Sequence, residues 1–321
     1  MLRFLHLVIE TALFILPIPR DRQIDREGRI PCTVIGAKEA GMLKHKEDWL
    51  NALRGFTAPL LFFLPFYAGF PTGHELLVAA LLWLALSDIN HILHLHVHHA
   101  FFKNELLNRI LDLCMGVVTG MTASNWRIQH VHGHHKGNQY EYGPAKEWEM
   151  RQFSIADALS YSTRTIWPIF FGPLSESFRK GIRQSTKYPL DYRWACIEQC
   201  GLLSVVIVLL VYYPWLTISF VLPWYFLVYF ISRYTDYLNH FGSTDPRSAA
   251  TNNSLNRFYN RVRCNFGYHS AHHFRPDAHW TGLPAIHDSI AHLIPGENLK
   301  AYGWSGFLMP YHFYLARHGR M

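Results

Sequence analysis

Apolar side chains along this chain are gathered into a few blocks that contain no basic residue. No Lys or Arg occurs between Arg54 and Lys103, and none occurs between Arg193 and Arg233. A basic side chain at the centre of a membrane span is costly, so gaps of this length are what membrane insertion requires. The pattern therefore predicts membrane helices inside both gaps.

Each of the two gaps divides into two apolar segments. The first pair covers residues 56–70 and 76–92, and the second pair covers residues 200–212 and 215–231, with a hinge near Pro214. Each segment is shorter than the roughly 20 residues of a complete span, so neighbouring residues must extend it. The fold class that we predict is an all-α integral membrane protein with two transmembrane helical hairpins, hence four main spans, and a cytoplasmic helical cap.

Basic residues are expected on one side of these hairpins. The turns between the paired segments contain no Lys or Arg, and all 30 basic residues lie on the other side. By the positive-inside rule, we expect a multi-pass protein whose two termini and central segment 101–193 are cytoplasmic. The histidine-rich segments described below, and with them the active site, would lie on the same side.

The hairpins and their connection define a membrane domain at residues 51–290. Residues 1–50 begin with an apolar stretch that contains Arg3 and Glu10 and lacks a small-residue cleavage site. This composition disfavours a signal peptide and favours an interfacial helix, or an additional membrane helix, followed by a cytoplasmic loop. Residues 291–321 are expected to form a cytoplasmic tail.

The composition adds a basic character to this picture. Half of the residues are hydrophobic, 15% are aromatic, and the net charge is +7 with a pI near 9.1. A basic face resting on anionic lipid explains the charge, and no basic recognition helix or aromatic RNA-binding signature indicates nucleic acid as a partner. The five cysteines form no CxxC pair, which is typical of reduced cytoplasmic thiols.

Histidines gather in three clusters, and the first follows the first predicted hairpin. Five histidines fall within residues 91–99. On a helix, His94 and His98 are spaced i, i+4 and lie on one face, so we prefer this pair as metal ligands. His91 is a weaker candidate, and the other histidines of the run are expected next to the metal site.

The second cluster is the most compact, with four imidazoles within residues 130–135. An unpaired buried ring nitrogen is unfavourable and exposed rings have no reason to cluster, so a metal is the natural partner. His130 and His134 would share one side of a helix, while His135 would point to the adjacent side and a second centre. Solvated loop histidines are the alternative for this cluster taken alone.

The third cluster contains His269, His272 and His273, which can face one point if the segment is helical. His240, at the end of the second hairpin, is a further candidate ligand or an interfacial residue. Asp236 precedes it by four residues and would fix the tautomer of its ring. The remaining isolated histidines are interpreted as surface or packing residues: His279, His287, His292, His312 and His318.

The favoured ligands in the three clusters number eight imidazoles, or nine with His240. This number exceeds the needs of one ion, because a zinc site takes four ligands and an oxidation-active iron site takes fewer than six. Two metal ions sharing the set fit the count. Neutral nitrogen donors suit iron, copper or zinc, and the composition of the clusters does not choose among them.

The clusters and their neighbours resemble the three histidine boxes of the membrane fatty acid desaturase and hydroxylase superfamily over about residues 50–290. The resemblance rests on three motifs: HLHVH at 94–98 followed by AFF, WR before HVHGHH at 130–135, and YHSAHH at 268–273 followed by Pro276.

Two features depart from the commonest desaturase pattern, one in the middle box and one in the first. The middle box is HxxxHH with the additional Gly133, and NHFG at 239–242 holds a histidine; both are similar to the alkane hydroxylase branch. The first box lacks the acidic residue that often follows its first histidine. These departures are compatible with a di-iron centre and leave the reaction open.

The resemblance implies two iron ions and O2 as co-substrate, with oxidation of an unactivated C–H bond in a fatty acyl or lipid-like chain. Desaturation is preferred; alkane-hydroxylase-like hydroxylation and oxidative decarboxylation to a terminal alkene are the alternatives. A separate electron donor is implied, a ferredoxin or a cytochrome with its reductase, because the chain has no cysteine set for a cluster and no appended haem domain. The metal ligands would be His94, His98, His130, His134, His135, His240, His269, His272 and His273.

Four further residues are candidates for supporting roles. Asn138 and Asn265 stand near the boxes as possible hydrogen-bond partners of ligand histidines. Arg127 and Arg275 are candidates for holding the head group of the substrate, with pairing to membrane lipid as the alternative.

A membrane metal transporter or metal-storing protein is the competing class. Transporters place ionisable ligands at mid-membrane in broken helices, or in low-complexity histidine loops. Here the histidines stand at span ends in three patterned groups, which favours the enzyme.

Overall fold

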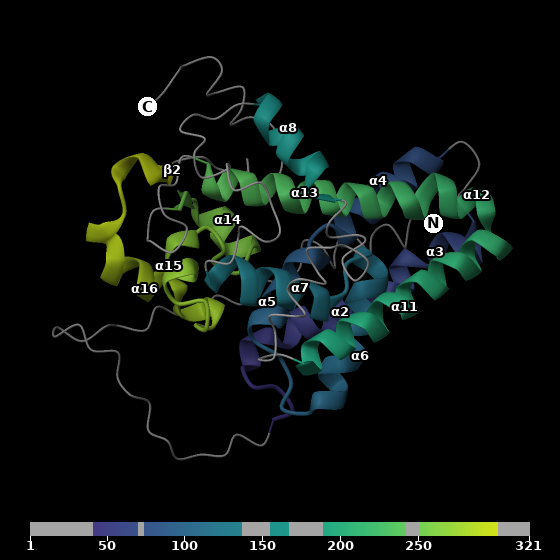
Figure 1. Ribbon diagram of the computed structural model, residues 1–321, viewed down its shortest axis with the longest axis horizontal. Helices are drawn as coiled ribbons and strands as arrows, with labels where there is room; N and C mark the ends of the chain where they lie inside the picture. Colours follow the sequence, from purple (N-terminus) through teal and green to yellow (C-terminus); the bar gives the residue numbers. More distant parts are fainter. Residues whose placement is uncertain (1–40, 70–73, 137–154, 167–188, 242–250, 301–321) are drawn as a thin grey trace.

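The computed structural model describes five parts of the chain: residues 41–69, 74–136, 155–166, 189–241 and 251–300. These residues are mostly helical (Figure 1), with one pair of short parallel strands, β1 (Asn253–Ser254) and β2 (Leu299–Lys300). The expected N-terminal helix, Asn138 and the tail beyond residue 300 lie outside the described residues. The mainly helical fold that the sequence predicts is confirmed.

The first long helix, α2 (Trp49–Phe62), ends before it reaches the length of a span. A break at Phe63 separates it from the short helix α3 (Leu64–Ala68), which has Pro65 in its first turn. Proline has no backbone N–H and its ring clashes with the preceding turn of a helix, so α2 does not continue through this point. The segment predicted as a span at residues 56–70 is therefore not one continuous helix in its described part, and it is not among the candidate spans.

Among the described residues, three helices are long and apolar enough to cross a membrane. Their bounds are Leu77–His98, Asp191–Tyr212 and Pro214–His240. They comprise α4 (Glu75–Leu86) with α5 (Ile89–His98), α11 (Pro189–Tyr212), and α12 (Pro214–Leu216) with η6 (Thr217–Val221) and α13 (Leu222–His240). The hinge predicted near Pro214 is present, and α11 and α13 run further than the predicted segments.

A bent pair of helices makes a fourth candidate span. The helix α6 (Glu105–Thr119) meets the segment Ala123–His132 at 90°. The bend passes through Gly120, whose φ of 71° is a left-handed conformation that glycine adopts without steric cost. A Cβ atom at Gly120 would lie 2.6 Å from the ring of Tyr225, so the close approach of α13 also requires glycine here.

Side chains of α13 hold this bend in place. The last carbonyls of a helix have no partner within the helix and need one when they are buried. Three donors of α13 supply it at 2.6–2.8 Å, from Trp224, Tyr225 and Tyr229 to the carbonyls of Val118, Val117 and Gly120. The bend is thereby fixed to α13, which is part of the candidate span Pro214–His240.

The remaining helices are shorter, and several of them surround the ends of α5 and α13. In particular, α8 packs along α13, α5 packs against α7 and η2, and α15 packs against α16. Their bounds are η1 (Lys46–Asp48), α7 (Ala123–Trp126), η2 (Arg127–Gly133), η3 (His134–Lys136), α8 (Ile155–Arg164), α14 (Arg257–Val262), α15 (His269–Phe274), η7 (Trp280–Gly282), α16 (Leu283–Ile290), η8 (Ala291–Leu293) and η9 (Gly296–Asn298).

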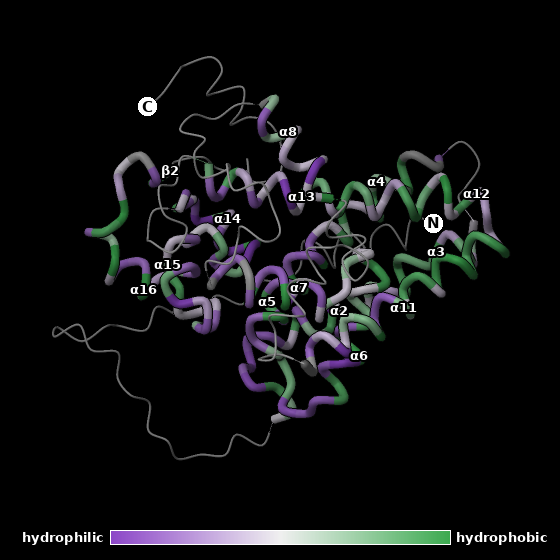
Figure 2. Tube along the Cα trace, in the orientation of Figure 1, coloured by the Kyte–Doolittle hydropathy of each residue, from purple (hydrophilic) through white to green (hydrophobic). Residues whose placement is uncertain are grey.

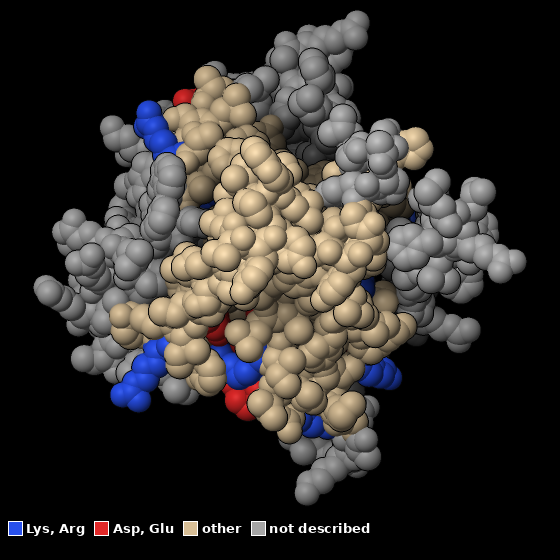
Figure 3. All heavy atoms as spheres, turned by 90° about the vertical axis from the view of Figure 1, so that its right-hand side faces the viewer, with Lys and Arg blue, Asp and Glu red and all other residues tan. Residues whose placement is uncertain are grey.

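The end of the molecule formed by α3, α4 and α12 is apolar. Figure 2 shows hydrophobic residues along these helices and α11, and more hydrophilic ones around α14, α15 and α16. Viewed from the apolar end, charged side chains lie mainly toward the edge of the face (Figure 3). Large apolar side chains such as Tyr67 and Trp215 are 88% and 82% exposed. An exposed apolar surface of this kind suits lipid rather than water.

Candidate metal centre

Nine histidines from separate parts of the chain meet between α5, α13 and α15. The end of α5 carries His94 and His98, and the bend after α7 carries His130, His134 and His135. The last residue of α13 is His240, and α15 carries the other three, His269, His272 and His273. The structure thus brings together every histidine that the sequence favours as a ligand, whereas the weaker candidate His91 is not among them.

The ring nitrogens of these histidines form two groups, each compact enough to hold one metal ion. The first group is His94, His98, His130 and His272, and the second is His134, His240 and His273. Within each group, one nitrogen from every ring lies within 4.8 Å of the others. The Nε2 atom of His134 lies 3.0 Å from that of His240 and 3.3 Å from that of His273.

The other two histidines lie at the edges of the groups. The Nε2 atom of His135 is 3.1 Å from Nε2 of His130, in the first group. The Nε2 atom of His269 is 3.1 Å from Nε2 of His240, in the second. The nine rings therefore divide into five and four.

The division within the middle cluster differs from the sequence-based prediction. His130 and His134 belong to different groups, whereas His135 lies with His130. The cause is local, because residues Arg127–Gly133 form a π-helix, in which hydrogen bonds run from i to i+5. With this winding, the ring of His135 lies about as close to His130 as the ring of His134 does, with centroids 4.7 and 5.0 Å away.

The third cluster is helical as predicted, but its rings do not face one point. Nε2 of His272 lies 3.2 Å from Nε2 of His94, in the first group. His273 and His269 point toward the second group. One short helix thus contributes to both candidate metal positions.

The electrostatic environment keeps these rings neutral. Burial lowers the pKa of His135, His269 and His272 well below the ordinary value of 6.5, and neighbouring imidazoles lower it further. Burial also lowers the pKa of His134, against the opposing charge of Asp236. A neutral imidazole keeps one nitrogen lone pair for a metal.

The ring nitrogens are better suited to bind a metal ion than to form hydrogen bonds with one another. The carbonyl of Pro276 accepts a hydrogen bond from the His98 ring. The Nε2 atom of His98 is buried and, within the described part of the chain, has no hydrogen-bond partner. A buried acceptor of this kind is unfavourable unless a cation or donor satisfies it. This backbone-fixed ring with a vacant inner nitrogen is typical of a metal ligand.

Neighbouring histidines have other partners. His91 is hydrogen-bonded through Nε2 to the carbonyl of Arg263 at 2.9 Å, so it is not part of either group. Nδ1 of His96 accepts the backbone N–H of Phe101, and its Nε2 atom lies 3.3 Å from Asp112. In the middle cluster, His132 contacts Asp191 of α11 at 3.0 Å. These rings tie the helices around the site together.

Asp236 lies beside His240, as the i, i+4 spacing predicts. Its Oδ1 atom is 3.7 Å from Nε2 of His240 and 4.0 Å from Nε2 of His134. The carboxylate thus approaches the inner nitrogens of the second group. Asn265 differs from the prediction, because its side-chain amide donates to the carbonyl of Trp280 at 3.1 Å rather than to a histidine.

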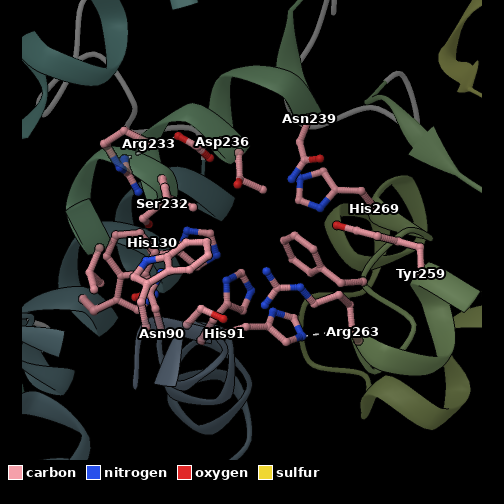
Figure 4. A pocket seen from close by; sticks show the side chains of 18 residues that line it. Asn90, His91, His130, Ser232, Arg233, Asp236, Asn239, Tyr259, Arg263 and His269 are labelled. Carbon is pink, nitrogen blue, oxygen red and sulfur yellow. Dashed lines mark hydrogen bonds and ion pairs between the residues drawn. The ribbon is translucent and has the colours of Figure 1, made fainter. Parts of the chain in front are cut away.

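A cavity opens next to both groups (Figure 4). It is lined by His94, His130, His269 and Asp236 on the metal side. Its other walls come from α4, α13, α14 and the segment between α14 and α15, and they include apolar side chains: Trp83, Val228, Ile231 and Phe266. Two of these walls belong to candidate membrane spans.

The two arginines predicted near a head group do not line this cavity. Arg127 lies 3.7 Å from Asp191, and the exposed Arg275 pairs with Asp277 at 3.1 Å. The arginines that line it are Arg233 and Arg263. Arg233 stands three residues before Asp236, a helical neighbour that the sequence shows; the position of Arg263 depends on long-range packing.

The fold and the site define a membrane protein with a buried set of histidines able to hold metal ions. A model of the fatty acid desaturase family matches residues 67–305, and the protein belongs to this family. No curated protein and no solved structure matches the chain. Membership makes the protein an oxidoreductase of lipid metabolism at a membrane, and it confirms the resemblance carried by the histidine boxes. Iron is the metal typical of the family.

Proposed function

We propose that this protein is a di-iron enzyme that uses O2 to oxidise an unactivated C–H bond in a fatty acyl or lipid-like chain, with desaturation as the outcome. The observation that carries the proposal is that seven largely buried histidines form two compact groups, with His135 and His269 next to them. Such a set of neutral nitrogen donors suits iron. Family membership gives the class of reaction and the lipid substrate.

The first iron would be held by His94, His98, His130 and His272, with His135 next to them. The second would be held by His134, His240 and His273, with His269 next to them. When bound, the two irons supply activation of O2 and oxidation of the C–H bond.

The cavity beside the histidines is the proposed site of the substrate. Its walls on α4 and α13 lie on candidate spans, so a lipid chain can reach it from the bilayer. Trp83, Val228, Ile231 and Phe266 would contact the chain and exclude water around it. Their task is to present one carbon to the metal, which is how a protein scaffold directs oxidation by a cofactor.

The redox balance requires an external reductant. Reduction of O2 to water takes twice the electrons that removal of two hydrogen atoms from the chain supplies. The rest must come from a ferredoxin, or from a cytochrome with its reductase. We place the docking face for this donor on the cytoplasmic side, with both termini and the active site, as the positive-inside rule indicates. A basic surface would attract an acidic donor.

Hydroxylation is the second candidate reaction. The observation that favours it is the position of His240 within 3.0 Å of His134, because the NHFG motif around His240 is similar to the alkane hydroxylase branch. Decarboxylation to a terminal alkene is a third outcome of the same oxidation.

Product analysis distinguishes these reactions. Purified protein in lipid nanodiscs is supplied with a ferredoxin, its reductase, NADPH, 18O2 and isotope-labelled acyl substrates, and the products are identified by mass spectrometry. Desaturation yields a product two hydrogens lighter with no 18O, whereas hydroxylation adds one 18O atom. Loss of the carboxyl carbon identifies the alkene-forming reaction. The His134→Ala variant is the control for background oxidation.

The same preparation tests the competing class. An enzyme of this kind retains about two irons per chain through purification. Zinc that exchanges across a vesicle containing the protein, with no oxidised product from any substrate, would instead support a transporter and contradict the proposal.

A further inference from the structure

The carboxylate of Asp236 faces the inner nitrogens of the second histidine group. Its Oδ1 atom lies 3.7 Å from Nε2 of His240 and 4.0 Å from Nε2 of His134. A carboxylate that only fixed the tautomer of His240 would contact the outer nitrogen of the ring, Nδ1. The observed approach is to the nitrogen that a metal would use.

Two neighbours orient this carboxylate. The hydroxyl of Tyr161 on α8 donates to Oδ2 at 2.7 Å, and Nη1 of Arg233 lies 3.4 Å from the same oxygen. Tyr161 is buried, so its hydrogen bond is shielded from solvent. Figure 4 shows Arg233 and Asp236 side by side on α13 above the cavity. With Oδ2 held in this way, Oδ1 is directed at the histidines.

The distances are close to those of a shared ion. Two atoms that each lie about 2.1 Å from one metal are about 3.0 to 3.4 Å apart for octahedral to tetrahedral angles. His134 meets this range with His240 and His273, at 3.0 and 3.3 Å. The distances from the oxygen of Asp236 exceed this range by less than about 1 Å, so direct ligation requires its side chain to rotate toward the ion.

Electrostatics favours an oxygen ligand at this point. Imidazole ligands are neutral, so a divalent ion held by histidines alone keeps its full charge in a buried site. A buried charge is unfavourable unless an opposite charge pairs with it. Imidazole together with carboxylate is also a donor set that suits Fe(II).

We propose that Asp236 supplies an oxygen ligand to the ion held by His134, His240 and His273. The two halves of the centre then differ, with nitrogen ligands alone around the first ion and a carboxylate at the second. The inference rests on the metal centre of the proposed function, and it is independent of which oxidation the enzyme performs.

Metal binding without turnover tests the proposal. Purified protein in detergent is stripped with a chelator, reloaded with Co(II), and assayed for cobalt content and visible absorption. Wild-type protein is expected to hold about two ions per chain. Asp236→Asn, which still accepts a hydrogen bond from Tyr161, is expected to hold about one. At the position that is lost, the affinity for Co(II) should fall by more than the roughly 10- to 100-fold seen when a residue that only hydrogen-bonds to a ligand is removed.

Matched variants identify the position and the cause. Tyr161→Phe keeps the carboxylate, so it is expected to hold two ions. That result would show that a disturbed contact between α8 and α13 does not cause the loss of an ion in Asp236→Asn. His94→Ala should remove the other ion, and the double variant with Asp236→Asn should hold none. Two ions in Asp236→Asn, with wild-type affinity and absorption, would overturn the proposal.

Asp236→Glu gives a second test if the Asn variant does not fold. It keeps the charge and moves the oxygen by one methylene group. A shifted Co(II) spectrum with two bound ions supports direct ligation, and a spectrum identical to wild type overturns it.

The outcomes separate this inference from the proposed function. Two ions in Asp236→Asn together with oxidised product from the wild type would remove the inference and leave the function standing. Loss of one ion in the variant with no product from the wild type would support the inference and count against the function.

Discussion

The indole of Trp126 lies flat against the imidazole of His130, with 5.0 Å between the ring centroids and 3° between the ring planes. The guanidinium of Arg233 lies over the same indole, 4.8 Å from its centroid. Since Arg233 also contacts Asp236, this stack links the first histidine group to α13. The orientation of His130 therefore depends on a buried aromatic side chain that is not itself a ligand.

Removal of the stack should weaken the first metal position. Trp126→Leu is expected to lower the free energy of unfolding by about 2–4 kcal/mol, as large-to-small changes at buried aromatic residues do, and to reduce bound iron. Trp126→Phe, which keeps a flat ring, should retain most of the bound iron. Metal analysis together with thermal unfolding in detergent checks both effects.

Phe62→Leu is the matched control. Phe62 is also buried, and its ring packs against Phe220 and Trp224, away from the histidines. It should lose stability with no change in iron per folded molecule. Full iron content in Trp126→Leu would show that the stack does not orient His130.

Single ligand histidines should be indispensable. We expect turnover to fall at least about 100-fold in His134→Ala, and likewise in His130→Ala and His135→Ala. The reason is that removing a ligand has a larger effect than removing a residue that hydrogen-bonds to a ligand. Membrane insertion should be unchanged. The measurement is product formation per inserted protein, beside iron content.

His287→Ala serves as the control for removal of a buried imidazole. Its ring packs against Tyr268, 5.0 Å between centroids, and belongs to neither histidine group. It should retain iron and most activity. An active His134→Ala variant would refute the assignment of His134 as a ligand.

Local spacing predicted much of this site. His94 and His98 lie on one helix in one group, as i, i+4 spacing requires, and α15 forms where the HxxHH pattern indicates a helix. The grouping of His130 with His135 was not predictable, because it depends on a π-helix that i, i+4 reasoning does not consider.

Long-range packing explains the other differences. Tyr161 reaches Asp236 across 75 residues of sequence, and Arg263 lines the cavity because α14 packs near α5. Hydropathy alone also missed the break before Pro65, since an apolar run does not show whether a proline interrupts its helix.

Gly267 provides a test of the third cluster. A Cβ atom there would lie 2.2 Å from the carbonyl oxygen of Ser254 and 2.5 Å from Oδ1 of Asn260. Gly267→Ala must therefore shift the backbone just before α15, at a typical cost of about 1–3 kcal/mol for overpacking. We expect loss of iron as His269 and His272 move. Gly282→Ala, which has open space at its Cβ, should leave iron content unchanged.

Acidification should destabilise the metal-free protein in a defined direction. Burial holds the pKa of His135, His269 and His272 well below the ordinary value of 6.5. Below that value the unfolded chain therefore binds protons that the folded chain does not. The contribution of these histidines to the free energy of unfolding is therefore complete above about pH 6.5. It falls as the pH decreases, by about 1.4 kcal/mol per pH unit for each such histidine.

Denaturant unfolding of the metal-free protein in mild detergent, from pH 8 to pH 5, checks this sign. His272→Gln removes one of the buried titrating rings, so its stability should fall less steeply below pH 6.5, by up to about 1.4 kcal/mol per pH unit. Stability that increased on acidification would mean that the folded protein binds the additional protons, and the rings would then not be the neutral donors that a metal requires. In the loaded protein, release of iron should follow the same direction, because the metal and protons compete for the same nitrogen lone pairs.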